Sequence, residues 1–363
     1  MILFSTPSAR TFLLAAAAFA ASTAGCTSPA GEGPRDDWQA RAAGYLDERS
    51  ASWLASPPPI SNVACAMSCH TTFPYVMARS SLAPFAKTPA ADDARARFEA
   101  RVADATAGTA IPFYGNDDND KGKQSHATEA VLNAAALALD DIGSGKPLGA
   151  STTSALDRMW AEQRADGTWD WLEFGLEPWE TRNDLGAALA ALVTGSIPAN
   201  TTSAQAAGTT KLVGYIQKRV DGMVLHDQAM VLWASGKLTG LLDPARADAI
   251  AADLAATQLE DGGFSLGAWG QGSLAEDRAT ESDGYATAIA VLALCSGTAQ
   301  GANRSDVQKG LSWLTHHQAD DGSWPGRSVN GDSAQVEGFM TDAATAYASL
   351  ALTTCVPDQT ASR

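Results

Sequence analysis

The chain has 363 residues, of which 45% are hydrophobic and 18% are charged, and its formal net charge is −16. So large an apolar fraction indicates a globular protein with a sizeable core rather than a disordered chain. The acidic balance disfavours nucleic acids and anionic lipid surfaces as partners, because both bind basic patches.

The first 25 residues have the pattern of an export signal. Arg10 precedes the apolar run TFLLAAAAFAA, which is too short to span a bilayer, and the small residues STAGC follow it. The AGC ending resembles a bacterial lipobox, with Thr23 where the motif prefers Leu, and it predicts a lipidated Cys26. Residues 26–36 would then be a tether. We expect a periplasmic or outer-membrane lipoprotein, with plain secretion as the alternative.

The next distinctive segment is CAMSCHTTFPY at 65–75, which holds two thiols and an imidazole. Haem c is attached through Cys–x2–Cys–His, and here Cys65, Cys69 and His70 have a spacing one residue longer. The segment therefore has two interpretations, a covalent haem with His70 on the iron or a Cys65–Cys69 disulfide. For a haem, His126 or Met340 would be the sixth ligand. We expect no zinc, since no second pair of cysteines accompanies the motif.

Three stretches share the order Gln, three residues, Gly, one residue, aromatic: QRADGTW at 163–169, QLEDGGF at 258–264 and, within HQADDGSW at 317–324, the part that begins at its Gln. Each follows an amphipathic helical pattern. The Gly is predicted to end the helix, because Gly adopts a left-handed conformation at little cost. The aromatic side chain should then fold back over the last helical turn.

Two kinds of helical segment alternate along the chain. One kind is almost wholly apolar and rich in Ala, which is typical of helices that are buried on all sides. The other kind is amphipathic. We predict an all-α fold over 37–355, an (α/α)6 barrel of six inner and six outer helices, with 356–363 as a tail. The inner segments are 70–83, 126–139, 182–195, 226–236, 282–295 and 341–355, and the outer ones lie near 37–54, 90–107, 151–164, 209–221, 243–258 and 303–318.

These repeats, with inner segments such as SDGYATAIAVLAL and TDAATAYASLAL, resemble the squalene–hopene cyclase and prenyltransferase repeat superfamily. The resemblance implies a toroid that binds an apolar, isoprenoid-type ligand in its central cavity and has cyclase or isomerase activity. The chain lacks the Asp–x–Asp–Asp motif of the protonating cyclases and the zinc ligands of the prenyltransferases. The alternatives are a haem protein for electron transfer or oxidation on the same scaffold, and a non-catalytic binding module.

Five inner segments begin with an acidic residue, which suits the first turn of a helix. If the inner helices run in one direction, these carboxylates surround one mouth, raise one another's pKa and supply a general acid. Aromatic side chains at this mouth, from Trp169 to Trp179 and at Tyr285, could stabilise a carbocation. The candidate acids are Asp283 and Asp342, which lie nearest the family's motif position, together with Glu129, Asp184 and Asp227.

Cys295 and Cys355 lie at the far ends of the last two inner segments. They follow Asp283 and Asp342 at similar distances along the chain, so they should lie at similar depth on adjacent helices. We expect a disulfide between them, with two buried thiols as the alternative.

Overall fold

The computed structural model describes residues 36–55, 68–85, 89–112, 114–115, 119–199 and 202–356. All of them belong to one compact unit that begins at residue 33. The predicted export signal, Cys26, Cys65 and residues 357–363 lie outside the described residues, as does the predicted tether up to residue 35.

The described chain is helical, and its helices alternate between an inner and an outer set. The outer helices are α1 (Trp38–Ala55), α3 (Pro89–Ala107), α5 (Ala150–Ala161), α7 (Gln205–Arg219), α9 (Pro244–Ala255) and α12 (Ser305–His316). The inner helices are α2 (Thr72–Arg79), α4 (Asp120–Gly143), α6 (Asn183–Ser196), α8 (Leu225–Ser235), α11 (Gly284–Gly297) and α13 (Ala334–Thr354). A short helix, α10 (Ala275–Arg278), lies in the connection before α11.

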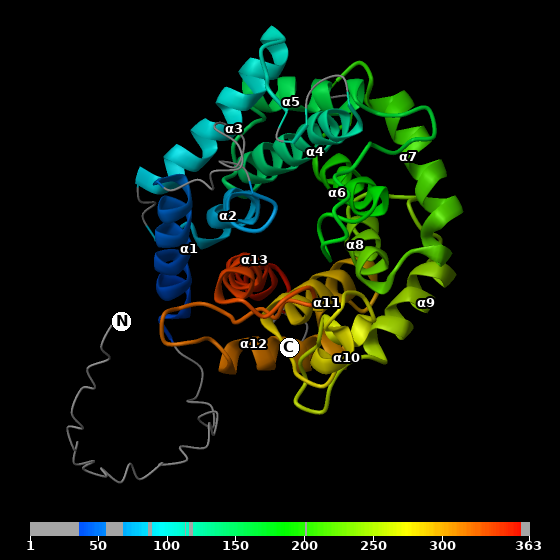
Figure 1. Ribbon diagram of the computed structural model, residues 1–363. Coiled ribbons are helices and arrows are strands. Elements are labelled where there is room, and N and C mark those ends of the chain that lie inside the picture. Colours follow the sequence, from blue (N-terminus) through cyan, green and yellow to red (C-terminus); the bar gives the residue numbers. More distant parts are fainter. Residues whose placement is uncertain are drawn as a thin grey trace, which may run out of the picture. The chain divides into compact units, whose positions relative to one another are not determined.

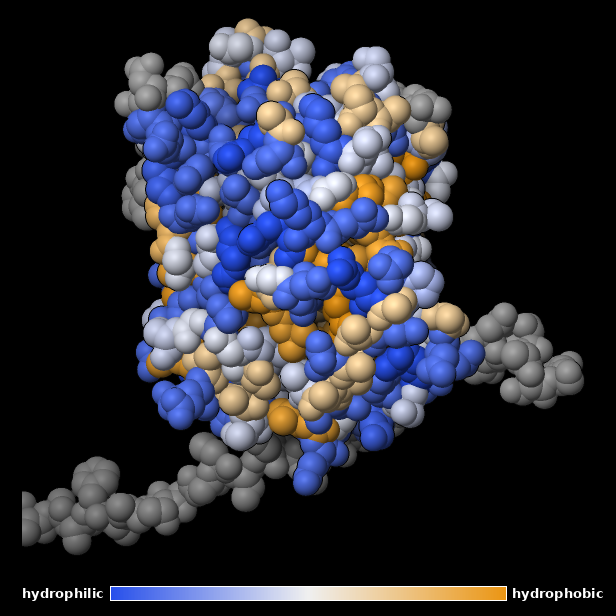
Figure 2. Space-filling view, turned by 90° about the vertical axis from the view of Figure 1, so that its right-hand side faces the viewer, coloured by the Kyte–Doolittle hydropathy of each residue, from blue (hydrophilic) through white to orange (hydrophobic). Residues whose placement is uncertain are grey.

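The inner helices form a closed ring, in which α2, α4, α6, α8, α11 and α13 each contact the next and α13 contacts α2 (Figure 1). The predicted all-α barrel of six inner and six outer helices is therefore confirmed. Polar side chains cover much of the side of the ring that carries α7 and α9, and apolar residues show between them (Figure 2). None of the described helices is both long and apolar enough to cross a bilayer.

Two inner helices begin earlier than the sequence predicts. Helix α4 begins at Asp120 because the Asn119 side chain accepts a hydrogen bond from the N–H of Gly122, at 2.9 Å. Helix α13 begins at Ala334, where the Ser333 side chain accepts from the N–H of Val336. Residues 120–125, which precede the predicted inner segment 126–139, are thus helical. Both helices extend beyond their neighbours at this end of the ring, and they form part of the wall described below.

The Gln–Gly–aromatic repeats join neighbouring outer helices. Gly167, Gly262 and Gly322 have φ values of 97°, 90° and 92°, which favour glycine. The prediction that they end the helices is wrong, because α5, α9 and α12 end six or seven residues earlier and each glycine lies in the turn that follows. The Nε1–H groups of Trp169 and Trp324 donate to the carbonyls of Met159 and Leu314, both at 2.7 Å, so these rings do fold back over the helix. Each Gln side chain also donates to the start of the next outer helix: Gln163 to Gly208, Gln258 to Asp306 and Gln318 to Trp38.

The C-terminal ends of the inner helices form what we call the closed end of the ring. Glycines allow their backbones to touch there: a Cβ at Gly195 would collide with Leu238, and one at Gly236 would collide with the carbonyl of Ser296. A disulfide joins Cys295 to Cys355, with 5.9 Å between their Cα atoms. The predicted pairing of these two cysteines is confirmed.

Candidate functional site

A cavity of about 370 Å³ opens at the other end of the ring, where the inner helices begin, and we call this the open end. Its wall comes from α1, the turn before α2, the middle of α4, the extended start of α13, and loops at 172–180 and 328–331, with Tyr114 from the segment before α4. The residues that line it are Trp53, Ser68, Cys69, His70, Tyr114, Thr128, Leu132, Leu172, Leu176, Glu177, Trp179, Glu180, Ser328, Asn330, Gly331, Gln335, Val336, Phe339 and Met340.

Most of this wall is aromatic or aliphatic, and two carboxylates are its only charged members among the described residues. Both carboxylates belong to a loop at 173–180, which turns back on itself through an isolated bridge between Leu176 and Glu180. The Asn330 side chain holds this loop to the second one: it accepts from the N–H of Glu177 at 3.0 Å and donates to its carbonyl at 2.5 Å. The two loops therefore form one connected part of the wall.

The two carboxylates have different surroundings. Glu177 is paired with the guanidinium of Arg182, with N–O distances of 2.5 to 2.8 Å. No described side chain forms an ion pair or hydrogen bond with the carboxyl group of Glu180. Burial raises the pKa of Glu180, and the charge of Lys121 offsets this only in part. Of the two, Glu180 is therefore the one suited to hold a proton at the cavity wall.

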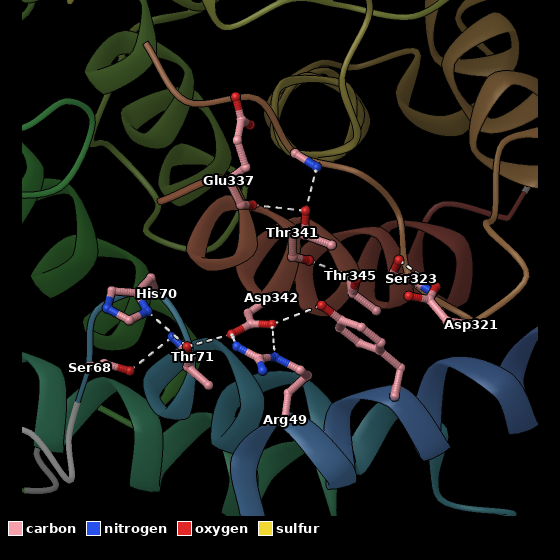
Figure 3. Close-up of polar contacts among 12 residues, drawn as sticks. Arg49, Ser68, His70, Thr71, Asp321, Ser323, Glu337, Thr341, Asp342 and Thr345 are labelled. Carbon is pink, nitrogen blue, oxygen red and sulfur yellow. Dashed lines mark hydrogen bonds and ion pairs between the residues drawn. The ribbon is translucent and has the colours of Figure 1, made fainter. Parts of the chain in front are cut away.

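His70 is half-buried in the same wall, among aromatic rings. The ring of Phe339 stacks on it at 3.9 Å, and Trp53 contacts it edge-on at 4.9 Å. Its Nδ1 is 2.8 Å from Oγ1 of Thr71, which donates in turn to Asp342 at 2.7 Å (Figure 3). Burial, with a smaller contribution from the charge of Arg49, lowers the pKa of His70 to about 3. The imidazole is therefore neutral at physiological pH.

A narrow pocket continues from the cavity toward the centre of the ring. Cys69, Leu132 and Trp179 line both spaces, and the pocket ends at Tyr285 and Tyr347. Its volume of about 10 Å³ is close to the least that holds one water molecule. The cavity is therefore the only one of these two spaces that can hold a larger ligand without rearrangement.

Hydrogen bonds hold one of the rings that ends this pocket. The hydroxyl of Tyr285 lies 2.9 Å from Nε2 of His226, whose Nδ1 lies 2.9 Å from Asp227. Because the carboxylate can only accept, His226 donates from Nδ1 to Asp227. The ring of Tyr285 packs edge-on against Trp179 at 5.6 Å. These contacts fix the deepest polar group of the pocket.

The five predicted acids do not form a shared cluster, and none of them lines the cavity. This corrects the prediction that they raise one another's pKa at one mouth. Glu129 and Asp342 lie well inside α4 and α13, because those helices begin earlier than expected. Four of the five have partners of their own: Glu129 has Arg101, Asp184 has Tyr215 and Arg219, Asp227 has His226 and Arg182, and Asp342 has Arg49, Tyr45 and Thr71.

Asp283 is the fifth, and it caps α11. Its two carboxylate oxygens accept from the backbone N–H groups of Ala286 at 2.9 Å and Leu266 at 2.8 Å. Burial raises the pKa of Asp283 to about 7, while these backbone donors act in the opposite direction. The cause is desolvation and not a second carboxylate. Asp283 therefore holds the start of a helix to the preceding loop rather than facing a ligand.

The residues that the sequence singled out for a haem are only partly together. Cys69, His70 and Met340 line the cavity, whereas His126 does not, and Cys65 lies outside the described residues. Within the described residues, no three His, Cys, Asp or Glu side chains are grouped so that they could hold a metal ion. Trp179, from the predicted aromatic segment, lines the cavity, while Trp169 lies fully in the core.

Comparisons with known proteins place the fold. No protein-family model matches the sequence, and no curated protein matches it. Among solved structures, the chain is similar to a protein from Actinoplanes at 13% identity, over 88% of this chain and 99% of that one, with a TM-score of 0.50. It is similar to the type II terpene cyclase MstE from Scytonema, solved as a variant in complex with its substrate geranylgeranyl dihydroxybenzoate, at 12% identity, over 88% and 99%, with a TM-score of 0.50.

A glycosidase matches at 14% identity over 90% of this chain and 100% of that one, with a TM-score of 0.48. At identities this low, a shared activity does not follow from a shared fold. The comparisons therefore concern architecture alone: this chain has an α/α-toroid fold, and a type II terpene cyclase has the same fold.

Proposed function

We propose that the protein binds an apolar, isoprenoid-type molecule in the cavity at the open end. One observation carries the proposal, a cavity of about 370 Å³ whose wall is mostly aromatic and aliphatic. Pockets of this size and composition are typical of sites for small apolar ligands. The terpene cyclase with the same fold was solved with a substrate that carries a geranylgeranyl chain, which agrees with an isoprenoid-type ligand.

Cyclase or isomerase activity, if the bound ligand reacts, would use Glu180 rather than the helix-start acids. Glu180 lies in the cavity wall, and burial raises its pKa above that of an ordinary glutamate. A raised pKa also makes it a weaker acid than an ordinary carboxyl group. It is therefore suited to transfer a proton to or from an activated position beside an oxygen, and unsuited to protonate an isolated double bond.

The binding proposal is tested with the full chain after removal of bound lipid. Trp53 and Trp179 line the cavity, so quenching of tryptophan fluorescence by geranylgeraniol should report binding. The variant Val336→Trp places a large ring in the cavity wall and should weaken binding at least tenfold. Val213→Trp, at a half-buried position of α7 remote from the cavity, is the matched control and should bind normally. Equal binding by both variants, or none by the parent protein, would refute the proposal.

A c-type haem at the same cavity is the second candidate, and a specific observation favours it. Cys69, His70 and Met340 share this wall, and Nδ1 of His70 is engaged by Thr71 while Nε2 has no hydrogen-bond partner among the described residues. Ligand histidines typically donate their other ring N–H to a neighbouring acceptor in this way. Cys69, His70 and Met340 would hold the group, which would supply one-electron chemistry when bound.

The haem candidate has a simple test. The protein is produced with its own leader in a host that matures c-type haem, and its absorption spectrum is recorded before and after denaturation. A Soret band that stays with the denatured chain supports covalent haem, and a colourless protein rejects it. Export and lipid attachment at Cys26 remain predictions, and the mass of the mature chain tests both.

A further inference from the structure

We infer that the cavity selects an uncharged ligand with a hydroxyl group, which donates a hydrogen bond to Nε2 of His70, over a diphosphate or a plain hydrocarbon. The inference deepens the proposed function and rests on it. It follows from the charge of the wall, from the direction of one chain of hydrogen bonds and from the packing of the imidazole.

The charge of the wall disfavours an anionic ligand. Its described residues include Glu177 and Glu180 but neither Lys nor Arg. Arg182 lies behind Glu177 and is already paired with that carboxylate. A diphosphate would lose its hydration shell without gaining a cation to replace it. An uncharged molecule carries no such penalty.

The proton on His70 can be placed from its neighbours. The carboxylate of Asp342 is paired with Arg49 at 2.7 Å and accepts hydrogen bonds only, so Thr71 must donate its single hydroxyl proton to Asp342 (Figure 3). Oγ1 of Thr71 then accepts from Nδ1–H of His70 at 2.8 Å. In a neutral imidazole, Nε2 consequently has a lone pair and no hydrogen. Thr71 and Asp342 are positioning residues in this arrangement.

The ring of His70 is also held in place. The Ser68 hydroxyl accepts from the backbone N–H groups of Thr71 and Thr72, both at 3.0 Å, which fixes the turn that carries His70. Phe339 stacks on one face of the imidazole and Trp53 meets it edge-on. Nε2 has no hydrogen-bond partner among the described residues. The cavity thus contains a fixed acceptor in a largely apolar wall.

A fixed acceptor discriminates between ligands. A hydrocarbon that fills the cavity would strip water from Nε2 and leave it unpaired, whereas a hydroxyl group would replace that water. We expect the alcohol to bind about tenfold more tightly than a hydrocarbon of the same length. The diphosphate should bind most weakly of the three.

The experiment compares geranylgeraniol, geranylgeranyl diphosphate and the hydrocarbon phytane by tryptophan quenching, on protein whose absorption spectrum shows no haem. The variant His70→Phe keeps an aromatic ring but removes the acceptor, so the alcohol and the hydrocarbon should then bind about equally. His317→Phe is the matched control, because His317 stacks on Trp313 of the outer helix α12, and it should keep the tenfold difference. Thermal unfolding checks that each variant is folded.

A second readout does not depend on any ligand. Nitrogen-15 NMR of the histidines should show Nδ1 of His70 protonated and Nε2 unprotonated. Thr71→Ser should keep that state and Thr71→Val should lose it. A proton on Nε2, a preference for the alcohol that persists in His70→Phe, or tightest binding of the diphosphate would each overturn the inference while leaving apolar binding intact. If none of the three compounds binds, the proposed function itself fails.

Discussion

Both ends of the ring contain buried ion pairs, including Arg79 with Asp47 and Arg95 with Asp140 toward the closed end, but the ends differ in their other contacts. At the closed end, glycines let backbones touch, and a disulfide joins Cys295 of α11 to Cys355, the residue that directly follows α13. At the open end, α4 and α13 begin early and loop residues line the cavity. Buried carboxylates there pair with arginines of the outer helices. Of these open-end pairs, Arg101 with Glu129 is the most buried, since only 4% of Arg101 and 3% of Glu129 are exposed.

The two ends therefore differ in how much their residues can change without disturbing the packing of the ring. Backbone contacts through glycine leave no room for a side chain where α6 and α8 end. The wall of the open end includes loops, which tolerate sequence change better than packed helices do. The cavity therefore lies at the end where the sequence is free to adapt to a ligand. Four predictions test this division, from the largest expected effect to the smallest.

The largest effect should come from breaking the buried pair at the open end. Arg101→Leu leaves the carboxylate of Glu129 buried without its bidentate partner, at 2.6 Å for both contacts, and should lower the free energy of unfolding by about 3–5 kcal/mol. Chemical denaturation measures this. The double variant Arg101→Leu/Glu129→Leu should recover most of the loss. If the double variant is no more stable than the single one, charge pairing does not hold this end.

The second largest loss of stability should come from disturbing a glycine contact at the closed end. Gly236→Ala forces a Cβ against the backbone of Ser296, and we expect a loss of about 2–3 kcal/mol in unfolding free energy. The control is Gly214→Ala in α7, where a Cβ meets no atom within 4 Å. That change should stabilise the protein by about 0.5–1 kcal/mol. Similar effects from the two changes would mean that close packing does not distinguish the closed end.

The third prediction concerns pH at the open end. Because the pKa of His70 is about 3 when folded and about 6.5 when unfolded, the unfolded chain takes up this proton first on acidification. The His70 contribution is thus complete above pH 6.5 and is lost as pH falls toward 3. Between pH 7 and 5, the parent should lose about 1–2 kcal/mol relative to His70→Phe, since the ring is only half-buried. An identical pH dependence of the two proteins would contradict this.

Asp283 acts with the opposite sign, which is why the comparison with His70→Phe is needed. Its pKa is raised from 3.8 to about 7, so its protonation stabilises the fold below about pH 4, and this contribution is lost as pH rises through 7. Both proteins in the comparison contain Asp283, so its contribution cancels in the difference between them.

The smallest effect on stability should come from the rim of the cavity. Leu176 is 48% exposed in the loop at the mouth. Leu176→Ser should change the unfolding free energy by less than about 0.5 kcal/mol but weaken geranylgeraniol binding roughly fivefold. Val356→Ser, at an exposed apolar position of the closed end, should change neither quantity. Unaltered binding in Leu176→Ser would remove this loop from the site.

The fold could be predicted from the sequence because periodic burial leaves a periodic pattern. The apolar run of α11 is buried at every position from Gly284 to Leu294, and the Trp rings of two repeats fold back over the preceding helix as predicted. The starts of α4 and α13 could not be placed, because single capping residues, Asn119 and Ser333, decide them. Local capping thus shifted two boundaries that the hydrophobic pattern alone did not set.

The candidate site was much less accessible to prediction. The sequence pattern of an acidic residue near a helix start is the same whether its side chain faces a ligand or an arginine. The arginine that pairs with Asp342 lies 293 residues away in the sequence, so the pattern does not reveal it. Glu177 and Glu180 lie in a loop whose path depends on Asn330, so no periodicity reveals them. The one available signal was the three glutamates inside the aromatic segment WDWLEFGLEPWE, two of which line the cavity.

The bond from Gln318 to Trp38 spans 280 residues and joins the last outer helix to the first. An open array of repeats can fray from a terminal unit, but a circle has no terminal unit. Loss of any one hairpin should therefore cost both of its neighbours their contacts, and unfolding should be cooperative. The same closure requires contacts of very high sequence separation, so the chain should fold slowly for an all-helical protein.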